Sequence, residues 1–339
     1  MRSGKTAAPT MDDIAIEAGV SQMTVSRVMR GVGKTSHEVR ERVEQAARRL
    51  GYVQNRLASA LREETTPLVA VVLPTLGNRV FSEVLTGLNE TLTDKMIQPV
   101  FGVSEYSLER EEEIVRELLA WRPRGIVLPG LEHTDATRAA IRASGVRVAE
   151  VMDIDGVPMS AAFGISQVEA GRATARYMLQ KGYRRFGYIG SQGGRDLRAV
   201  KRYSGFCEVI REAGAQMVLH QVIDAPSSMV EGRKMTADVL GRSDAPEALY
   251  YSNDDLAAGG IMHCLSNGID IPGSVALAGF NGLAFLEALP IRLTTIETPR
   301  LDMGRRAAHY VTDSTSAQDG WSDTDIVDLG FRLVRGDSC

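Results

Sequence analysis

The chain has 339 residues, 44% of them hydrophobic and 24% charged, and a formal net charge of −4. This length and apolar content are ample for a buried core and indicate two or three domains. The longest apolar runs, such as residues 68–73, have the length of a strand and exclude a bilayer-spanning helix.

The N-terminus and the cysteines bear on the compartment. The first ten residues hold no apolar segment of the kind that directs secretion. Cys207, Cys264 and Cys339 lie far apart, without a CxxC motif or a histidine pair near them. We therefore expect free thiols in a cytoplasmic protein, with no disulfide framework, no zinc site and no cofactor.

The charge is distributed unevenly. Residues 1–62 contain 11 Lys and Arg against 6 Asp and Glu, whereas the remainder contains 28 against 37. A small basic head on an acidic body is expected if only the head must approach a polyanion.

The basic head is predicted to be helical throughout. Thr10 and Asp13 have the spacing of a capping box, and Gly19 is suited to end the helix that they begin. Ser21 and Ser36 are suited to cap two further helices, ending near Met29 and at Gly51. Short helices joined through the tight turn "AGVS" indicate a helix-turn-helix unit.

Residues 52–67 have the composition of a linker. Asn55 is suited to cap a brief helix that carries Leu57, Ala58 and Leu61, and Pro67 follows. About seven residues are too few for a helix that is stable alone, so we expect this segment to order only against a partner.

From residue 68 onward, short apolar runs alternate with helical patterns. Strands are predicted over 68–75, 98–104, 125–130 and 147–153, with helices over 79–94, 108–120 and 134–143. A second series has strands over 185–191, 248–254 and 275–282 and in "QMVLHQV", with helices over 198–213, 229–240 and 255–267. Such alternation predicts two lobes, each a parallel sheet covered by helices.

The helix predicted after Ser21 carries an unusual set of polar side chains. Gln22, Met23 and Arg27 are suited to the base edges of a DNA major groove, and Ser21 and Thr24 to phosphates. The alternative is a solvated helix of a small bundle. Leu61 is suited to wedge between base pairs in the minor groove, or else to dock on the neighbouring lobe.

Specific motifs now add a family resemblance. "AGVS", "TVSRV" and "LGYVQNRLASAL" occur at the separation found in the DNA-binding head of LacI/GalR repressors, and "YYSNDDLAAGG" and "VALAGFNG" resemble that family's effector-domain signatures. The resemblance implies an all-α helix-turn-helix head and an α/β periplasmic-binding-protein-like body of two parallel-sheet lobes. It also implies a homodimer on double-stranded, palindromic operator DNA and a hinge helix with Leu61 as its wedge. The DNA-binding residues are then Thr10, Ser21, Gln22, Met23, Thr24, Ser26, Arg27, Arg30, Asn55, Arg56, Ala58 and Leu61.

Within that family the body most resembles the gluconate-operon repressors, through "VVLPTLGNRVFSEVLTGL", "VAEVMD" and "ETPRLDMG". This implies a sugar-acid effector, gluconate or 2-ketogluconate. Arg202 matches the family's effector-contacting arginine and is suited to a carboxylate. The expected effector-binding residues are Asn78, Phe81, Glu150, Gln167, Arg202, Asn253 and Asn281. The alternatives are that Arg202 pairs on the surface and that Asn253 only caps a helix.

Two departures from the family pattern favour an anionic ligand. Many members carry Asp-Asn where this chain has Ser166-Gln167, and often Asp where it has Asn281. Fewer carboxylates mean less repulsion of an acid.

An enzyme is not expected. "GSQGGRD" lacks the Lys-Ser/Thr of a P-loop and the spacing of a dinucleotide fingerprint, and the histidines have no metal-ligand spacing. The expected organisation is a DNA-binding domain over 1–53, a hinge and linker over 54–67, and an effector-binding and dimerisation domain over 68–339. The pattern leaves open whether the effector releases the operator or strengthens its binding, and whether the chain is instead a sugar-binding protein without a DNA function.

Overall fold

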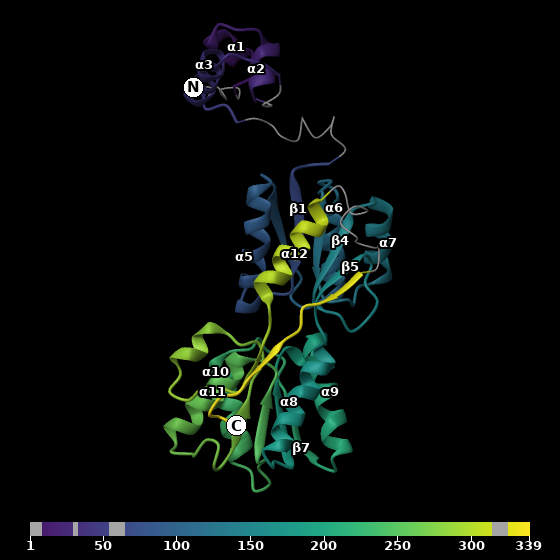
Figure 1. The fold of residues 1–339 in the computed structure, drawn as a ribbon, viewed down its shortest axis with the longest axis vertical. Helices are drawn as coiled ribbons and strands as arrows, with labels where there is room; N and C mark the ends of the chain where they lie inside the picture. The colour runs from purple at the N-terminus through teal and green to yellow at the C-terminus, as the bar shows by residue number, and fades with distance from the viewer. Residues whose placement is uncertain (1–8, 30–32, 54–64, 314–324) are drawn as a thin grey trace, which may run out of the picture. The chain divides into compact units, whose positions relative to one another are not determined.

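The computed structural model describes residues 9–29, 33–53, 65–313 and 325–339 (Figure 1). The chain divides into two compact units, Met1–Thr66 and Pro67–Cys339, which we call the head and the body. Among helices of the described residues, none combines the length and the apolar character needed to cross a bilayer.

The head consists of α1 (Met11–Ala18), α2 (Gln22–Met29) and α3 (His37–Leu50). Ile14, Val25 and Val43, one from each helix, are fully buried in its core. The predicted capping residues are confirmed, because Thr10, Ser21 and Ser36 each accept a backbone N–H three residues on. Gly19 and Gly51 end their helices at φ of 64° and 67°, a conformation that glycine adopts without strain.

The first lobe of the body, the N-lobe, is built on a parallel sheet of strand order β11-β5-β4-β3-β1-β2. Its strands are β1 (Leu68–Leu73), β2 (Gln98–Val103), β3 (Gly125–Pro129), β4 (Arg147–Asp153), β5 (Ala161–Ile165) and β11 (Asp325–Asp328). Helices α5 (Arg79–Asp94) and α12 (Arg300–Thr312) pack with one face, and α6 (Leu108–Leu119) and α7 (Asp135–Ser144) with the other.

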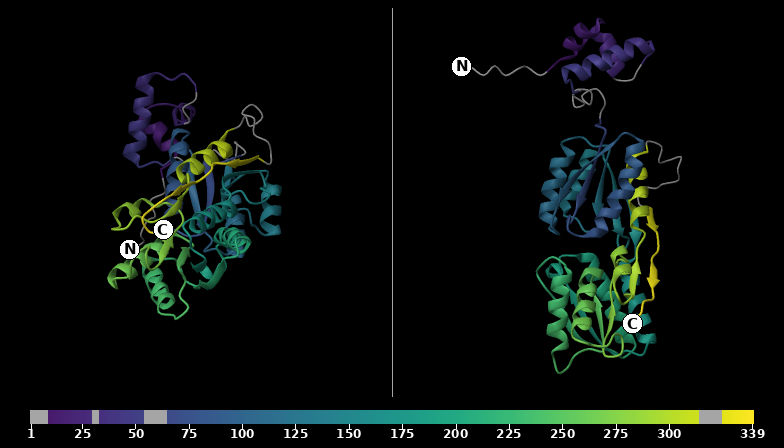
Figure 2. Two further views of the ribbon diagram at one scale, coloured as in Figure 1. Left: turned by 60° about the horizontal axis from the view of Figure 1, so that its bottom comes forward. Right: turned by 90° about the vertical axis from the view of Figure 1, so that its left-hand side faces the viewer.

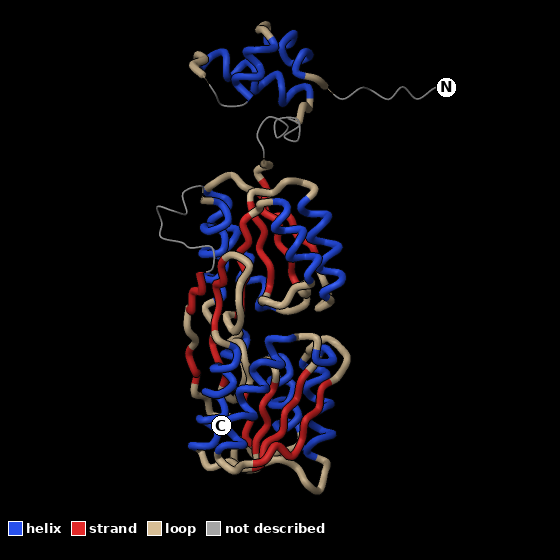
Figure 3. Tube along the Cα trace, turned by 90° about the vertical axis from the view of Figure 1, so that its right-hand side faces the viewer, coloured by secondary structure: helices blue, strands red, loops and turns tan. Residues whose placement is uncertain are grey.

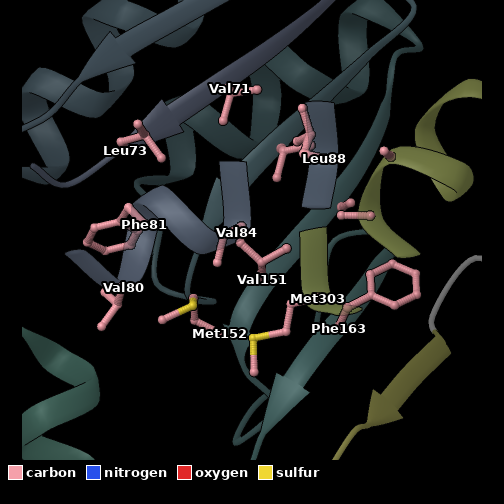
Figure 4. Packing of buried hydrophobic residues seen from close by; sticks show 14 of the residues in the cluster. Val71, Leu73, Val80, Phe81, Val84, Leu88, Val151, Met152, Phe163 and Met303 are labelled. Atoms are coloured by element: carbon pink, nitrogen blue, oxygen red, sulfur yellow. The ribbon is translucent and has the colours of Figure 1, made fainter. Parts of the chain in front are cut away.

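Side chains alternate along β1 between these two layers. Val71 and Leu73 join the cluster of α5 and α12, part of which Figure 4 shows, whereas Ala70 and Val72 join that of α6. A strand whose two faces are both covered reads as a continuous apolar run, which explains "LVAVVL".

The second lobe, the C-lobe, is likewise a sheet covered by helices (Figure 3). Its strand order is β7-β6-β8-β9. Its strands are β6 (Arg185–Gly190), β7 (Gln216–Val222), β8 (Ala248–Tyr251) and β9 (Ala276–Ala278). Helices α8 (Gln167–Gln180) and α9 (Leu197–Glu212) cover one face, and α10 (Met229–Leu240) and α11 (Asp254–Ser266) the other. Short 3-10 turns, η1 (Gln192–Gly194) and η2 (Ala284–Ala288), lie between these elements.

The chain passes between the lobes after β5, after β9 and between β11 and β12 (Arg332–Val334), as Figure 2 shows for the C-terminal strands. There β12 pairs antiparallel with β10 (Thr295–Glu297). The prediction of two helix-covered parallel sheets is confirmed. The sequence pattern alone does not mark β5 or α12, because β5 is a short run of mostly small residues and α12 mixes charged, small and apolar residues without a clear stripe.

Candidate functional sites

The exposed face of α2 presents the residue types expected of it. Gln22, Met23 and Arg27 are exposed, Met23 to 64%, while Val25 and Val28 are buried against α1 and α3. The Ser21 hydroxyl lies 2.9 Å from that of Thr24 and accepts the Thr24 N–H, which fixes the start of the helix. Ser26 is half-buried on the same helix.

Thr10 serves its own helix. Its hydroxyl donates to Asp13 at 2.7 Å, and its backbone N–H donates to the same carboxylate. These bonds, the backbone one foremost, hold the pKa of Asp13 below its ordinary value. Arg30, Asn55, Arg56, Ala58 and Leu61, which were predicted to contact DNA, lie outside the described residues.

A cleft between the two lobes of the body collects most of the predicted effector residues. It is lined by Asn78, Phe81, Gln167, Arg202, Asn253 and Asn281. Asn253 and Asn281 follow β8 and β9, at the carboxyl edge where open α/β sheets bind ligands. Asn253 also accepts the Leu256 N–H at 3.1 Å, so its capping role and its place in the cleft coexist.

Arg202 is a buried cation in this cleft. It is 5% exposed, and its two terminal nitrogens donate to Gln167 Oε1 at 2.6 Å and to the Ser252 carbonyl at 3.0 Å. The guanidinium lies 3.7 Å from the centre of the Phe280 ring, and its Nε has no hydrogen-bond partner. Among the described residues no carboxylate lies within 4.0 Å of it. A buried cation without a counter-ion is costly, so this position favours a bound anion.

Glycines set the position of Arg202. A Cβ at Gly171 of α8 would lie 1.9 Å from the Arg202 carbonyl oxygen, and one at Gly205 would lie 2.2 Å from the Val168 carbonyl oxygen. Because neither residue has a side chain, α8 and α9 approach closely enough to hold Arg202 beside Gln167.

Sequence reasoning missed two residues of the same region. Arg198, one turn before Arg202 on α9, is 7% exposed, and its Nε lies 3.3 Å from Asp196 Oδ1. The Tyr106 hydroxyl is hydrogen-bonded to Asn78, and burial raises the pKa of Tyr106 to about 12. The four-residue spacing from Arg202 was a signal for Arg198. The sequence held no signal for Tyr106, because its place depends on a left-handed backbone conformation, with a φ of 61°, that its residue type does not predict.

Strained backbone lies in the wall of the cleft. Asn281 and Met152 have φ of 124° and 81° without being glycine. The Asn281 carbonyl accepts from Arg300, and the Met152 carbonyl accepts from Gln167 at 2.5 Å. Such conformations cost about 1–3 kcal/mol each and cluster at functional sites.

An ion bridge joins the lobes beside the cleft. Lys201 of α9 lies 2.5 Å from Asp153 at the end of β4 and 2.6 Å from Glu132, both in the N-lobe. The Asp153 side chain is fully buried, so Lys201 supplies its charge partner. With the lobes joined in this way, the cavity beside Arg202 measures about 30 Å³, which is room for roughly two or three water molecules.

Comparisons with known proteins identify the family. Residues 10–55 match the model "Bacterial regulatory proteins, lacI family", and residues 175–339 match a periplasmic binding protein-like domain. The HTH-type transcriptional regulator GntR of Pseudomonas aeruginosa is 35% identical over 98% of this chain and 96% of its own. The chain belongs to the LacI family. It is a DNA-binding transcriptional regulator and not an enzyme, as the resemblance implied.

Other LacI-family members agree with this assignment. IdnR of Escherichia coli is 29% identical over 97% of this chain and 98% of its own. A crystal structure of a LacI-family regulator from Silicibacter pomeroyi is 44% identical, covers 97% of this chain and 99% of its own, and has a TM-score of 0.92. The structure of GntR from Chromobacterium violaceum is 34% identical over 80% of this chain and 98% of its own, with a TM-score of 0.73.

Glu150 is the predicted effector residue that the structure does not bring to the cleft. It is fully buried in the N-lobe, accepts the Met159 N–H at 2.6 Å and lies 3.3 Å from His133 Nε2. The other ring nitrogen of His133 lies 2.5 Å from Glu111. Burial opposes the charge on His133, but the two carboxylates outweigh it and raise its pKa to about 9. Glu150 is therefore a partner of an imidazolium in this LacI-family body.

Proposed function

We propose that this LacI-family regulator is a cytoplasmic repressor of sugar-acid utilisation genes. Its effector is a sugar acid, gluconate or 2-ketogluconate, and binding of the acid between the lobes releases the operator. The observation that carries this proposal is the buried guanidinium of Arg202, which has no carboxylate partner among the described residues. A ligand carboxylate would supply the missing negative charge and could accept a further hydrogen bond from the guanidinium, whose Nε has no partner.

The remaining cleft residues suit the hydroxyls of such an acid. Asn78, Gln167, Asn253 and Asn281 offer amide groups that both donate and accept. Phe81 supplies an apolar wall, and the Arg198 guanidinium lies 5.6 Å from its ring centre. Ser166 and Asn281 stand where many family members carry Asp, and their uncharged side chains avoid repelling an anion.

On the DNA side, Gln22, Met23 and Arg27 are the residues proposed to read base edges from α2 in the major groove, with Ser21 and Thr24 on phosphates. The proposed division of the chain is 1–53 for this domain, 54–67 for the hinge and linker, and 68–339 for the body. Leu61 is proposed as the wedge of the hinge on sequence grounds.

A homodimer is proposed from the surface of the C-lobe. Met229 and Val230 of α10 and Met262 and Leu265 of α11 are exposed large apolar side chains, Val230 to 62%, on helices that pack together. A two-fold interface over them presents two heads to a palindromic operator.

The test is fluorescence anisotropy with labelled DNA from upstream of a sugar-acid gene cluster, at several salt concentrations and with gluconate or 2-ketogluconate. We expect salt-sensitive binding to the DNA that either acid reverses. Strengthened binding would identify a ligand-dependent co-repressor type, and an absence of any response to both acids would refute the sugar-acid effector.

A further inference from the structure

A second cavity lies in the C-lobe, between the edge strand β7 and helix α9. Its volume is about 370 Å³, against about 30 Å³ at the cleft beside Arg202. The wall is made of Tyr188, Val200, Tyr203, His220 and Val222, and the η1 loop lies at its mouth. Neither the DNA-binding head nor the sugar-acid proposal uses this cavity.

Aromatic rings form the floor of the cavity. The rings of Tyr203 and His220 are stacked with centres 4.4 Å apart, and Tyr188 lies 4.5 Å from Tyr203 and 5.5 Å from His220. Partial burial lowers the pKa of His220, which favours its neutral imidazole. Such a cluster offers flat, uncharged faces to a further ring.

The segment "GSQGGRD" shapes the mouth of the cavity. Gln192, Gly193 and Gly194 follow one another at φ of 65°, 57° and 84°, a left-handed run that glycine makes possible. A Cβ at Gly190 would lie 2.9 Å from the Tyr188 ring, so a glycine is required where that ring lies. These glycines, which fit no phosphate-binding motif, instead leave the cavity open.

Charge separates the two cavities. Asp196 lines both cavities and is the one Asp, Glu, Lys or Arg among the described residues that line the second, whereas Arg198 and Arg202 line only the cleft. A sugar-acid anion is thus favoured in the cleft and disfavoured beside Asp196. We propose that the second cavity binds a planar aromatic molecule of one or two fused rings that carries no negative charge.

The second cavity shares structural elements with the effector cleft. Asp196 lines both, and the Tyr188 hydroxyl is hydrogen-bonded to Ser252, whose carbonyl accepts from Arg202. Helix α9 contributes Tyr203 to the cavity and Arg202 to the cleft. A ring bound against Tyr203 therefore contacts the same helix that holds the effector's arginine.

Calorimetric titration of the full chain with indole, tryptamine and indole-3-acetate tests the proposal, because the probes share a ring and differ in charge. We expect saturable binding of indole and tryptamine, one molecule per chain, and at least tenfold weaker binding of indole-3-acetate. Indole-3-acetate binding as tightly as tryptamine, or no saturation by any probe at millimolar concentration, overturns the proposal.

Variants test whether indole binds in the second cavity. Tyr203→Ala removes a floor ring and should weaken indole about tenfold. Val200→Trp fills the cavity from a position that is 44% exposed, so it keeps the test valid if Tyr203→Ala does not fold. Phe101→Ala, which removes a 47% exposed ring elsewhere on the body, should leave indole binding unchanged. Indole binding that survives Val200→Trp, or that disappears in Phe101→Ala, places the binding elsewhere and refutes the assignment.

Discussion

Replacement of Arg202 by methionine should weaken ligand binding without lowering the stability of the ligand-free protein. The guanidinium is 5% exposed and has hydrogen bonds to Gln167 and Ser252 but no ion pair among the described residues. Truncating one partner of a buried charge pair costs about 2 kcal/mol or more in affinity, so we expect the sugar acid to bind at least ~30-fold more weakly. The ligand-free protein loses an uncompensated buried charge, so its free energy of unfolding should not fall.

A second buried arginine provides the matched control. Arg300 is 3% exposed, but its Nε and Nη2 lie 3.0 Å and 3.2 Å from the two carboxylate oxygens of Glu83. It also donates to the backbone carbonyls of Asn281 and Gly282. Arg300→Met should therefore lower the free energy of unfolding by about 2 kcal/mol, allowing for the partial exposure of Glu83.

Isothermal titration calorimetry with gluconate and 2-ketogluconate, together with urea unfolding of the ligand-free protein, measures both quantities. Operator affinity without ligand should be the same for Arg202→Met and for the natural chain. The reasoning is refuted if Arg202→Met binds the acid with unchanged affinity, or if it loses as much stability as Arg300→Met. Either result would make Arg202 a structural residue.

Three further predictions concern other parts of the chain. Lys201→Met should lower the free energy of unfolding by about 2 kcal/mol in urea, because the buried Asp153 loses its cation; no loss would mean that the bridge is not formed in solution. His133 has a pKa of about 9 in the folded chain against about 6.5 when unfolded, so its stabilisation is complete below pH 6.5 and is lost as the pH rises to 9. Unfolding titrations between pH 6 and 9.5 should show this decline, and His133→Gln should be flatter over the same range. Leu61→Ala should weaken operator binding while sparing non-specific DNA in anisotropy assays, and equal losses on both would count against a wedge.

Much of the fold could be predicted from the sequence, because helix ends and covered strands are determined by residues close together in the chain. Thr10, Ser36 and Gly51 begin and end helices through bonds within a few residues, which the sequence alone specifies. The covered strands of both lobes likewise read directly as apolar runs. By contrast, β11 comes from the far end of the chain and pairs with β5 in the N-lobe sheet. Its four residues, "DIVD", are too few to predict that pairing.

Two of the residues proposed for the site lie in the cleft because of their position in the chain. Asn253 and Asn281 follow strands, and the carboxyl ends of parallel strands share one edge. Glu150 lies within β4 and not at its carboxyl end, so this rule does not apply to it. Its pairing with His133, from the loop after the neighbouring strand, could not be predicted from the sequence. The position of the Tyr106 side chain depends on the left-handed backbone conformation of Glu105 and Tyr106. Neither residue type predicts that conformation.

The bridge from Lys201 to Asp153 and Glu132 bears on how much sugar acid is needed to switch the genes. If the ligand must part the lobes to enter, its apparent affinity equals its intrinsic affinity multiplied by the fraction of chains whose lobes are apart. The strength of this bridge then sets the concentration threshold for induction without any contact with the ligand. Substitutions at these three positions are therefore expected to change the effector concentration at which the protein responds, while the binding pocket stays the same.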